Sequence, residues 1–411
     1  MGWKILLPQE IMSEGRKLLE DAGHTVIDGR GFETEDVLAD FKEYQPDAMI
    51  VRITPITREV IESNPNLKVI VRHGAGFDAL DVKACHDNNV QALYAPVANS
   101  TSVAETAMLL ILECSRNVTV LHKTWVNDFY KAKLKVRKNT LNGKTIGLIG
   151  CGNIGSRVAK RCLAFEMNVL AYDPYKPASE FPDGVEVVRD LDRIFKECDY
   201  VSLHCPNTPV TKNMVNKERL AMMKPTAFLI NTARGGCVDE DALYEACKNG
   251  VIAGAGLDAI KKEPVDPANP LLTLDNVIIY PHIGGNTSEA AHRASYFAAM
   301  GVQEVYEARS RHGRSTMLTI RQLRPTQTQR NRIQNRLECL ISKQSFANFF
   351  SHITKAGRTY RSDRFCLFCY TFIIFIPMYT TSSSVLISRS SAFVYELPFT
   401  ALYRLSNSSF P

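Results

Sequence analysis

One short segment constrains the fold of this 411-residue chain more than any other. The pattern Gly-x-Gly-x-x-Gly at residues 150–155 follows an apolar run at 145–149 and opens a helix-like stretch at 154–164. Asp173 stands 18 residues after Gly155, directly behind a second apolar run at 169–172. A strand, a glycine turn, a helix and a second strand that ends at an acidic residue are typical of a dinucleotide-binding parallel sheet.

Each glycine of this motif has its own physical role. Gly150 makes the tight turn, Gly152 lets the backbone approach a pyrophosphate, and Gly155 lets the helix pack closely on the strand. The helix N-terminus then offers N–H groups and a partial positive charge to the phosphates. Asp173 would accept hydrogen bonds from the adenosine ribose and repel a 2′-phosphate, which predicts NAD rather than NADP. The nearby Lys176 either softens this preference or is simply solvated.

Similar alternations of apolar runs and helix-like stretches occur on both sides of the motif. Strands are predicted at residues 47–53, 67–71, 200–204, 228–231, 254–257 and 277–280. Helices are predicted at residues 13–22, 36–44, 100–116, 191–197 and 288–307, the third with Ser100 or Thr101 as its N-cap. Repeated units of this kind predict an α/β protein with two Rossmann-like, doubly wound parallel-sheet domains.

Charge divides the chain into two parts. Residues 309–411 carry 15 basic and 3 acidic side chains, a net charge of +12, whereas residues 1–308 carry 34 basic and 40 acidic ones, a net charge of −6. The mildly acidic body gives no sign of a nucleic-acid surface. Eleven cysteines without the paired spacing of a metal site, and no N-terminal signal peptide, predict free thiols in the cytoplasm and no bound metal.

Three ionisable residues follow predicted strands late in the chain, namely Arg234, Glu263 and His282. Since ligands of open α/β sheets bind beyond the carboxyl ends of the strands, all three are expected beside a bound nicotinamide. A guanidinium can hold a carboxylate or keto oxygen, and an imidazolium can protonate a carbonyl as a hydride arrives at its carbon. A carboxylate next to the imidazole would fix its tautomer and raise its pKa.

Taken singly, each of these residues has a structural alternative. Arg234 could pair with Asp239 or Glu240 at the surface. Glu263 could simply begin a proline-containing loop, and His282 could be a satisfied histidine at the end of a strand. The order of the motifs, rather than any single residue, favours the catalytic interpretation.

That order resembles the D-isomer-specific 2-hydroxyacid dehydrogenases. The resemblance covers residues 4 to about 308 and rests on the glycine motif with its Asp, NTARGG, a Glu-Pro step and PHIGG. It implies hydride transfer between NAD(H) and a 2-hydroxy or 2-oxo acid, with Arg234 binding substrate, His282 as the acid/base and Glu263 as its partner. It also implies that the cofactor is lined by Asn153, Ile154, Cys205, Thr232, Ala233, Asp258, Ile283, Gly284 and Gly285.

The resemblance extends to substrate-binding positions. Backbone N–H groups of Gly74, Ala75 and Gly76 would take the substrate carboxylate, and Asn99 matches a family position at the substrate cleft. Phosphoglycerate dehydrogenase, an enzyme of serine biosynthesis, looks most similar. This interpretation rests on Arg52 and Arg72, which match residues that face a substrate phosphate in that enzyme. Each arginine could instead be a charged residue at the end of a strand. Hydroxypyruvate or glyoxylate reductases and NAD-sensing corepressors share the main motifs and remain alternatives.

The family fold also implies the domain organisation. Residues 1–99 and 288–308 would form a discontinuous substrate domain, and residues 100–287 the NAD-binding domain, with a linker-like stretch at 123–144. Residues 103–144 would correspond to the arm of a homodimer. Residues 309–411 match no family pattern and are predicted to be a disordered, out-of-frame tail. The rival interpretation is a membrane anchor at 365–379, but 15 residues fall short of the roughly 20 needed to span a bilayer.

Overall fold

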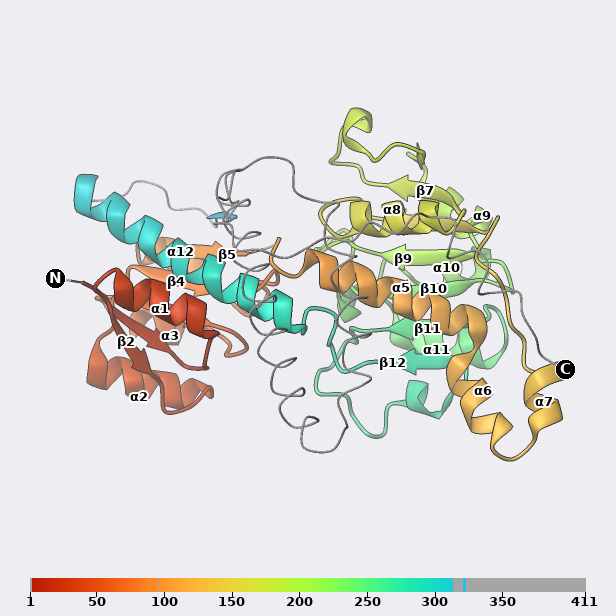
Figure 1. Ribbon diagram of the computed structural model, residues 1–411, viewed down its shortest axis with the longest axis horizontal. Coiled ribbons are helices and arrows are strands. Elements are labelled where there is room, and N and C mark those ends of the chain that lie inside the picture. Colours follow the sequence, from red (N-terminus) through yellow and green to blue (C-terminus); the bar gives the residue numbers. More distant parts are fainter. Residues whose placement is uncertain (1, 96, 313–320, 323–411) are drawn as a thin grey trace, which may run out of the picture. The chain divides into compact units, whose positions relative to one another are not determined.

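The computed structural model describes residues 2–95, 97–312 and 321–322, and they contain two parallel sheets (Figure 1). The first sheet has six strands in the order β13-β5-β4-β3-β1-β2. Its strands are β1 (Lys4–Leu7), β2 (Thr25–Asp28), β3 (Ala48–Val51), β4 (Val69–Arg72), β5 (Gln91–Tyr94) and β13 (Arg321–Gln322). Apart from the short β13, this is the 2-1-3-4-5 order of a flavodoxin-like doubly wound sheet.

The second sheet has seven strands in the order β12-β11-β10-β9-β6-β7-β8. Its strands are β6 (Thr145–Ile149), β7 (Asn168–Tyr172), β8 (Val185–Val187), β9 (Tyr200–Leu203), β10 (Phe228–Asn231), β11 (Gly254–Leu257) and β12 (Val277–Ile279). When the sheet is read from β8 and its strands are numbered in chain order, they run 3-2-1-4-5-6-7. The first six follow the order of the dinucleotide-binding fold. The predicted fold class, two doubly wound parallel sheets, is therefore confirmed.

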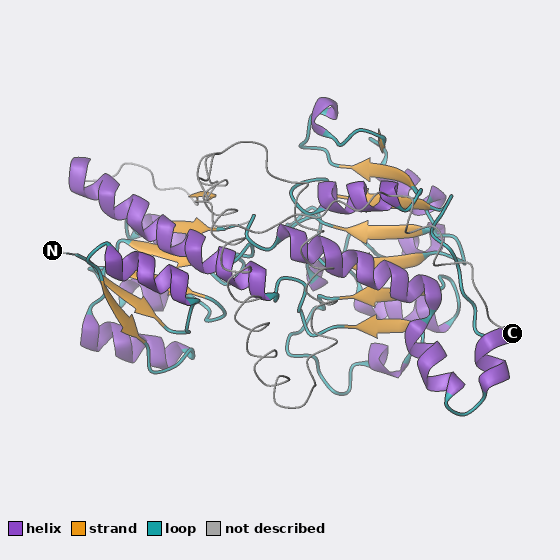
Figure 2. Ribbon diagram, viewed as in Figure 1, coloured by secondary structure: helices purple, strands orange, loops and turns teal. Residues whose placement is uncertain are grey.

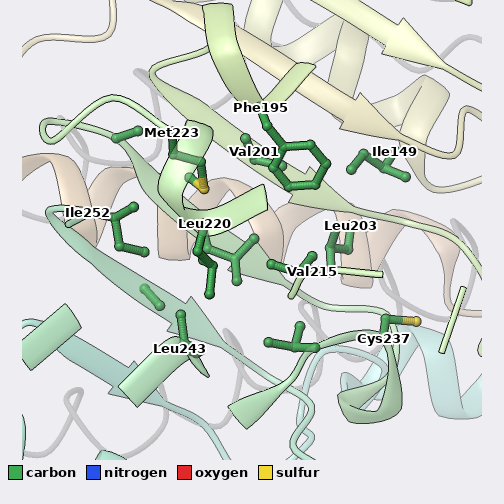
Figure 3. Close-up of a cluster of buried hydrophobic side chains, with 14 of the residues drawn as sticks. Ile149, Phe195, Val201, Leu203, Val215, Leu220, Met223, Cys237, Leu243 and Ile252 are labelled. Atoms are coloured by element: carbon green, nitrogen blue, oxygen red, sulfur yellow. The ribbon is translucent and has the colours of Figure 1, made fainter. Parts of the chain in front are cut away.

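Helices cover both faces of the seven-stranded sheet (Figure 2). One face packs against α5 (Ser100–Arg116) and α8 (Gly155–Ala164). The other packs against α9 (Leu191–Glu197), α10 (Lys217–Met222) and α11 (Glu240–Lys248), through the apolar cluster in Figure 3. Full burial of each large side chain in such a cluster stabilises the fold by roughly 1.5–3 kcal/mol. These layers hold the carboxyl ends of the strands at one edge of the sheet.

The six-stranded sheet is covered by α1 (Ser13–Asp21), α2 (Thr34–Tyr44), α3 (Arg58–Glu62), α4 (Val82–Asp87) and the late helix α12 (Ser288–His312). Helix α12 packs against α1 and β4, although it follows the second sheet in sequence. The two helices approach closely at Gly15, where a Cβ would lie 2.6 Å from the carbonyl oxygen of Ser295. The Ser295 hydroxyl accepts a hydrogen bond from the Met12 N–H at 2.9 Å, which fixes the start of α1.

Three predictions of local structure were wrong. The N-cap of α5 is Asn99, not Ser100 or Thr101. Residues 123–144 are not a linker, because they hold the end of α6 (Val118–Trp125) and all of α7 (Phe129–Leu134). Helix α12 continues past residue 308, and Arg309 donates hydrogen bonds to the carbonyls of Lys68 and Asn89, so the ordered body extends into the region predicted to be tail.

Most of the predicted tail, including the membrane-anchor candidate at 365–379, lies outside the described residues. Within the described ranges, no helix has the length and apolar character needed to cross a membrane.

Candidate functional site

The glycine turn between β6 and α8 has three different constraints at its three glycines. Gly150 has φ 93°, and a Cβ there would lie 2.6 Å from the carbonyl oxygen of His204. A Cβ at Gly155 would lie 2.2 Å from the carbonyl oxygen of Gly150. A Cβ at Gly152 would meet nothing within 4 Å. Gly150 and Gly155 therefore serve packing and turn geometry, whereas Gly152 faces open space in front of the turn.

Asp173 is held directly beside this turn. Its carboxylate accepts hydrogen bonds from the N–H groups of Cys151 at 3.0 Å and Tyr175 at 3.1 Å. The expectation that Lys176 is solvated was wrong, because its ammonium donates to the Cys151 carbonyl at 2.7 Å and the Ser156 hydroxyl at 3.1 Å. Since those bonds engage the ammonium, Lys176 is poorly placed to attract a 2′-phosphate.

His282 and Glu263 lie in contact. The Nδ1 atom of His282 is 2.7 Å from Oε2 of Glu263. His282 has φ 54°, a left-handed conformation that costs energy for a residue with a Cβ. Asp258 holds the following turn in place, because its carboxylate accepts hydrogen bonds from the N–H groups of Ile283 at 2.9 Å and Gly284 at 2.8 Å.

The electrostatics of this pair favour a protonated imidazole. The hydrogen bond to Glu263 raises the pKa of His282, and burial opposes that rise. Burial raises the pKa of Glu263, but the hydrogen bond and the charge of His282 outweigh it and leave that pKa below its ordinary value. The imidazole therefore keeps its proton to a higher pH than a free histidine does.

Arg234 does not pair with Asp239 or Glu240. Its Nε donates to Oδ2 of Asp78 at 2.8 Å, and its Nη1 donates to the carbonyl of Ala233 at 2.7 Å. The same guanidinium lies against the backbone of Gly76, where it leaves no room for a Cβ. Asp239 instead caps α11 and Glu240 accepts a hydrogen bond from the Lys261 N–H.

The loop after β4 offers the groups expected of an anion-binding loop. Among the described residues, the N–H groups of Gly74, Ala75 and Gly76 have no hydrogen-bond acceptor. Arg72 precedes them and is partly buried; burial, and next the charge of Arg234, lower its pKa to about 10. Its Nη1 lies 3.3 Å from the carbonyls of Val51 and His73.

Arg52 follows β3, the strand next to β4 in the sheet. It donates from Nη1 to the Glu10 carbonyl at 3.1 Å, and its charge contributes to the lowered pKa of Arg72. The structure thus brings both Arg52 and Arg234 close enough to Arg72 to lower its pKa.

Comparison with known proteins agrees with this arrangement. Residues 108–284 match the model of the "D-isomer specific 2-hydroxyacid dehydrogenase, NAD binding domain". The chain is 40% identical over 294 residues to hydroxypyruvate reductase of Thermotoga maritima, which covers 71% of this chain and 94% of that protein. The chain belongs to the D-isomer-specific 2-hydroxyacid dehydrogenase family.

Two further members of this 2-hydroxyacid dehydrogenase family show the range of the similarity. D-3-phosphoglycerate dehydrogenase of Methanocaldococcus jannaschii is 41% identical over 304 residues, which are 74% of this chain but only 57% of that protein. The chain therefore spans little more than half the length of this relative. The crystal structure of D-lactate dehydrogenase from Aquifex aeolicus, complexed with NAD and lactic acid, matches at 30% identity and a TM-score of 0.66, covering 75% of this chain and 96% of the other.

The described residues of this family member fit NAD. No protein atom lies within 4 Å of a Cβ at Gly152, so the backbone there is open to a pyrophosphate, and Asp173 lies beside the turn, where its carboxylate would accept hydrogen bonds from a ribose. Two buried oxygens, Oγ1 of Thr232 and Oδ1 of Asn99, have no partner among the described residues. Buried polar atoms normally find a partner, so these two point to a ligand.

The other predicted cofactor contacts follow successive strands of the same sheet. Asn153 and Ile154 lie in the glycine turn after β6, Cys205 follows β9, and Thr232 and Ala233 follow β10. Asp258 follows β11, and the Ile283–Gly285 turn comes after β12, so the shared edge brings these residues together. Sequence reasoning missed one residue, Asp78, although it lies two residues after Gly76 of the predicted substrate loop. No pattern of spacing signals that it pairs with Arg234.

Proposed function

We propose that the chain is an NAD-dependent dehydrogenase that interconverts a 2-hydroxy acid and the corresponding 2-oxo acid. The observation that carries the proposal is the 2.7 Å contact of His282 with Glu263 in a fold whose glycine turn and Asp173 fit a dinucleotide. Arg234 supplies the cationic group that such an acid needs.

The chain's own residues divide the work of the reaction. When bound, the nicotinamide ring supplies or accepts the hydride. In the direction of reduction, Arg234 and the N–H groups of the loop at 74–76 hold the substrate carboxylate and orient its keto group. His282, fixed at Nδ1 by Glu263, donates a proton from Nε2 to the developing alkoxide. In the reverse direction, the neutral imidazole takes the hydroxyl proton at the same atom.

For the substrate, we propose 3-phosphoglycerate and 3-phosphohydroxypyruvate. The phosphate of either molecule needs at least one cationic partner, and Arg72 lies near enough to both Arg52 and Arg234 for their charges to lower its pKa. Hydroxypyruvate is the second candidate, because a hydroxypyruvate reductase is 40% identical to this chain along nearly its own full length.

A panel of substrates tests both candidates. NADH oxidation is measured with 3-phosphohydroxypyruvate, hydroxypyruvate and glyoxylate, and we expect the highest kcat/KM with the phosphorylated acid. Replacing Arg52 by Ala should lower kcat/KM for that acid at least tenfold more than for hydroxypyruvate. A preference for hydroxypyruvate in the wild-type protein would overturn the phosphate assignment, and no turnover with all three would favour an NAD-sensing binding role.

We also propose a homodimer formed through α6, α7 and the turn between them. This segment exposes a row of apolar side chains, which a monomer would leave in water: Trp125, Val126, Phe129, Tyr130 and Leu134. Sedimentation velocity tests the proposal. The Leu134→Asp variant should dissociate to monomers, whereas Val210→Asp, at an equally exposed apolar residue outside the segment, should remain dimeric. A monomeric wild-type protein would refute the proposal.

A cytoplasmic location is proposed because the cysteines are free thiols. All eight cysteines of the described part of the chain are free, and seven are buried. Free thiols are typical of reducing compartments.

A further inference from the structure

Two cysteines from segments that are distant in sequence meet beside the proposed cofactor site. Cys205 follows β9, and Cys237 ends the short 3-10 helix η2 (Gly235–Cys237) after Arg234. Each thiol shifts the pKa of the other.

Independent contacts place the two segments together. The Sγ of Cys237 is 3.9 Å from the carbonyl oxygen of Pro206, the residue after Cys205. The Asn207 side chain lies so close to Gly236 that a Cβ there would sit 2.4 Å from the amide nitrogen. In Figure 3, the sulfur of Cys237 points away from the other labelled side chains of the apolar cluster. Both thiols are thus fixed at the edge of that cluster.

The pair differs chemically from the other cysteines of the described residues. The neighbouring Cys205 thiol lowers the pKa of Cys237, the Thr211 hydroxyl and the charge of Arg234 add to this effect, and burial opposes it. The neighbouring Cys237, and then burial, raise the pKa of Cys205. Buried thiols elsewhere have raised pKa values from desolvation, about 12 at Cys198, for example. Cys205 is also the one thiol of the eight that is not fully buried.

We propose that Cys205 and Cys237 form a reversible disulfide that switches the site off. The oxidant is a hydroperoxide, which enters at the half-buried Cys205. The pair releases one proton to solvent, and the remaining proton lies on Cys237, which leaves the Cys205 sulfur as the thiolate. That sulfur attacks the peroxide and the O–O bond breaks, which gives the Cys205 sulfenic acid and an alkoxide or hydroxide that takes the proton of Cys237 and leaves as an alcohol or water. The Cys237 thiolate formed in this way attacks the sulfenic sulfur, so that the S–S bond forms, the S–O bond breaks, and the departing hydroxide takes a proton from solvent and leaves as water.

The disulfide would act on Arg234. An S–S bond is about 2.05 Å long, shorter than any non-bonded contact between two sulfur atoms, so its formation must draw η2 and the segment after β9 together. Gly235 is packed closely against the neighbouring backbone, because a Cβ there would lie 1.9 Å from the backbone of Ile260. The Arg234 carbonyl accepts from the Cys237 N–H at 3.2 Å, which transmits the movement to Arg234. The loss of activity rests on the proposed function, but formation of the disulfide does not.

Peptide mapping of the full chain tests the bond itself. The reduced protein is treated with hydrogen peroxide, alkylated and digested with trypsin without reduction. The proposal expects the fragment 197–212 linked to the fragment 235–248, with fragment ions assigning the bond to Cys205 and Cys237 rather than to Cys198 and Cys247. Dithiothreitol should remove the link. Absence of this link at peroxide concentrations that oxidise other thiols would overturn the proposal, whether or not any substrate is turned over.

Activity and NADH binding test its consequence. We expect peroxide to lower wild-type activity at least tenfold, in proportion to the linked fraction, and dithiothreitol to restore it. The variants Cys237→Ser and Cys237→Ala should both resist inactivation by peroxide. The matched control Cys198→Ser changes a buried thiol on the same tryptic fragment as Cys205, and it should still be inactivated by peroxide. If no substrate is turned over, fluorescence titration with NADH replaces the assay, with weaker binding expected in the oxidised protein. Equal sensitivity of the Cys237 variants and the wild type would overturn the switch.

Discussion

Arg234 donates a hydrogen bond from Nε to Oδ2 of Asp78 at 2.8 Å, which joins the segment after β10 to the loop after β4. The carboxylate thus orients the guanidinium that is proposed to bind substrate. We expect Asp78→Ala to lower kcat/KM about tenfold, or about 1.4 kcal/mol, mostly through KM. The loss is modest because both side chains are partly exposed. Asp78→Asn keeps an acceptor oxygen and should lose less. Steady-state kinetics check this order, and equal losses in the two variants would contradict it.

His282 is the proposed proton donor, so His282→Ala should lower turnover by a factor on the order of 10² or more. NADH should still bind, because the glycine turn and Asp173 are untouched. His292→Ala is the matched control, since His292 also contacts a glutamate, Glu14 at 2.8 Å, but lies on α12. Its turnover should be near normal. Turnover and NADH fluorescence are measured for both variants, and a near-normal rate in His282→Ala would remove His282 from the mechanism.

The raised pKa of His282 predicts a pH profile. Reduction of the oxo acid needs the imidazolium, so its rate should persist above pH 6.5, the ordinary pKa of histidine, and fall as pH rises through the raised value. Oxidation needs the neutral imidazole and should rise through the same value. The Glu263→Gln variant lacks the main cause of the shift, so the pH dependence of both reduction and oxidation should move to lower pH. Rates of both reactions, measured from pH 5 to pH 10 in the wild type and the variant, test this prediction. An unchanged pH dependence in Glu263→Gln would show that Glu263 does not set the pKa of His282.

The sequence was sufficient for the fold class because periodic apolar runs and the glycine motif are local signals. Short or partly exposed strands escaped it: β2 and β8 carry no fully buried residue, and therefore no clear apolar run. The helix α7 was missed because its lysines and exposed aromatic side chains show no apolar face towards the chain's own core.

For the site, the sequence placed Glu263, His282 and Arg234 after strands of the same sheet, and the parallel order of those strands brings their ends to one edge. The partner of Arg234 could not be predicted, because Asp78 lies 156 residues away in a loop of the other sheet. The contact of Cys205 with Cys237 was also hidden. A pair of cysteines separated by 32 residues gives no signal until β9 and β10 lie side by side.

Two of the glycines in the turn after β6 allow a direct test of cofactor binding against folding. A methyl group at Gly155 would overlap the carbonyl oxygen of Gly150, so Gly155→Ala should destabilise the fold by about 1–3 kcal/mol and lower Tm by several degrees. A methyl group at Gly152 meets no protein atom, so Gly152→Ala should leave Tm nearly unchanged. It should nevertheless weaken NADH binding about tenfold or more, because the pyrophosphate must approach the backbone there. Thermal unfolding and NADH titration of both variants check the contrast, and full NADH affinity in Gly152→Ala would move the cofactor away from this turn.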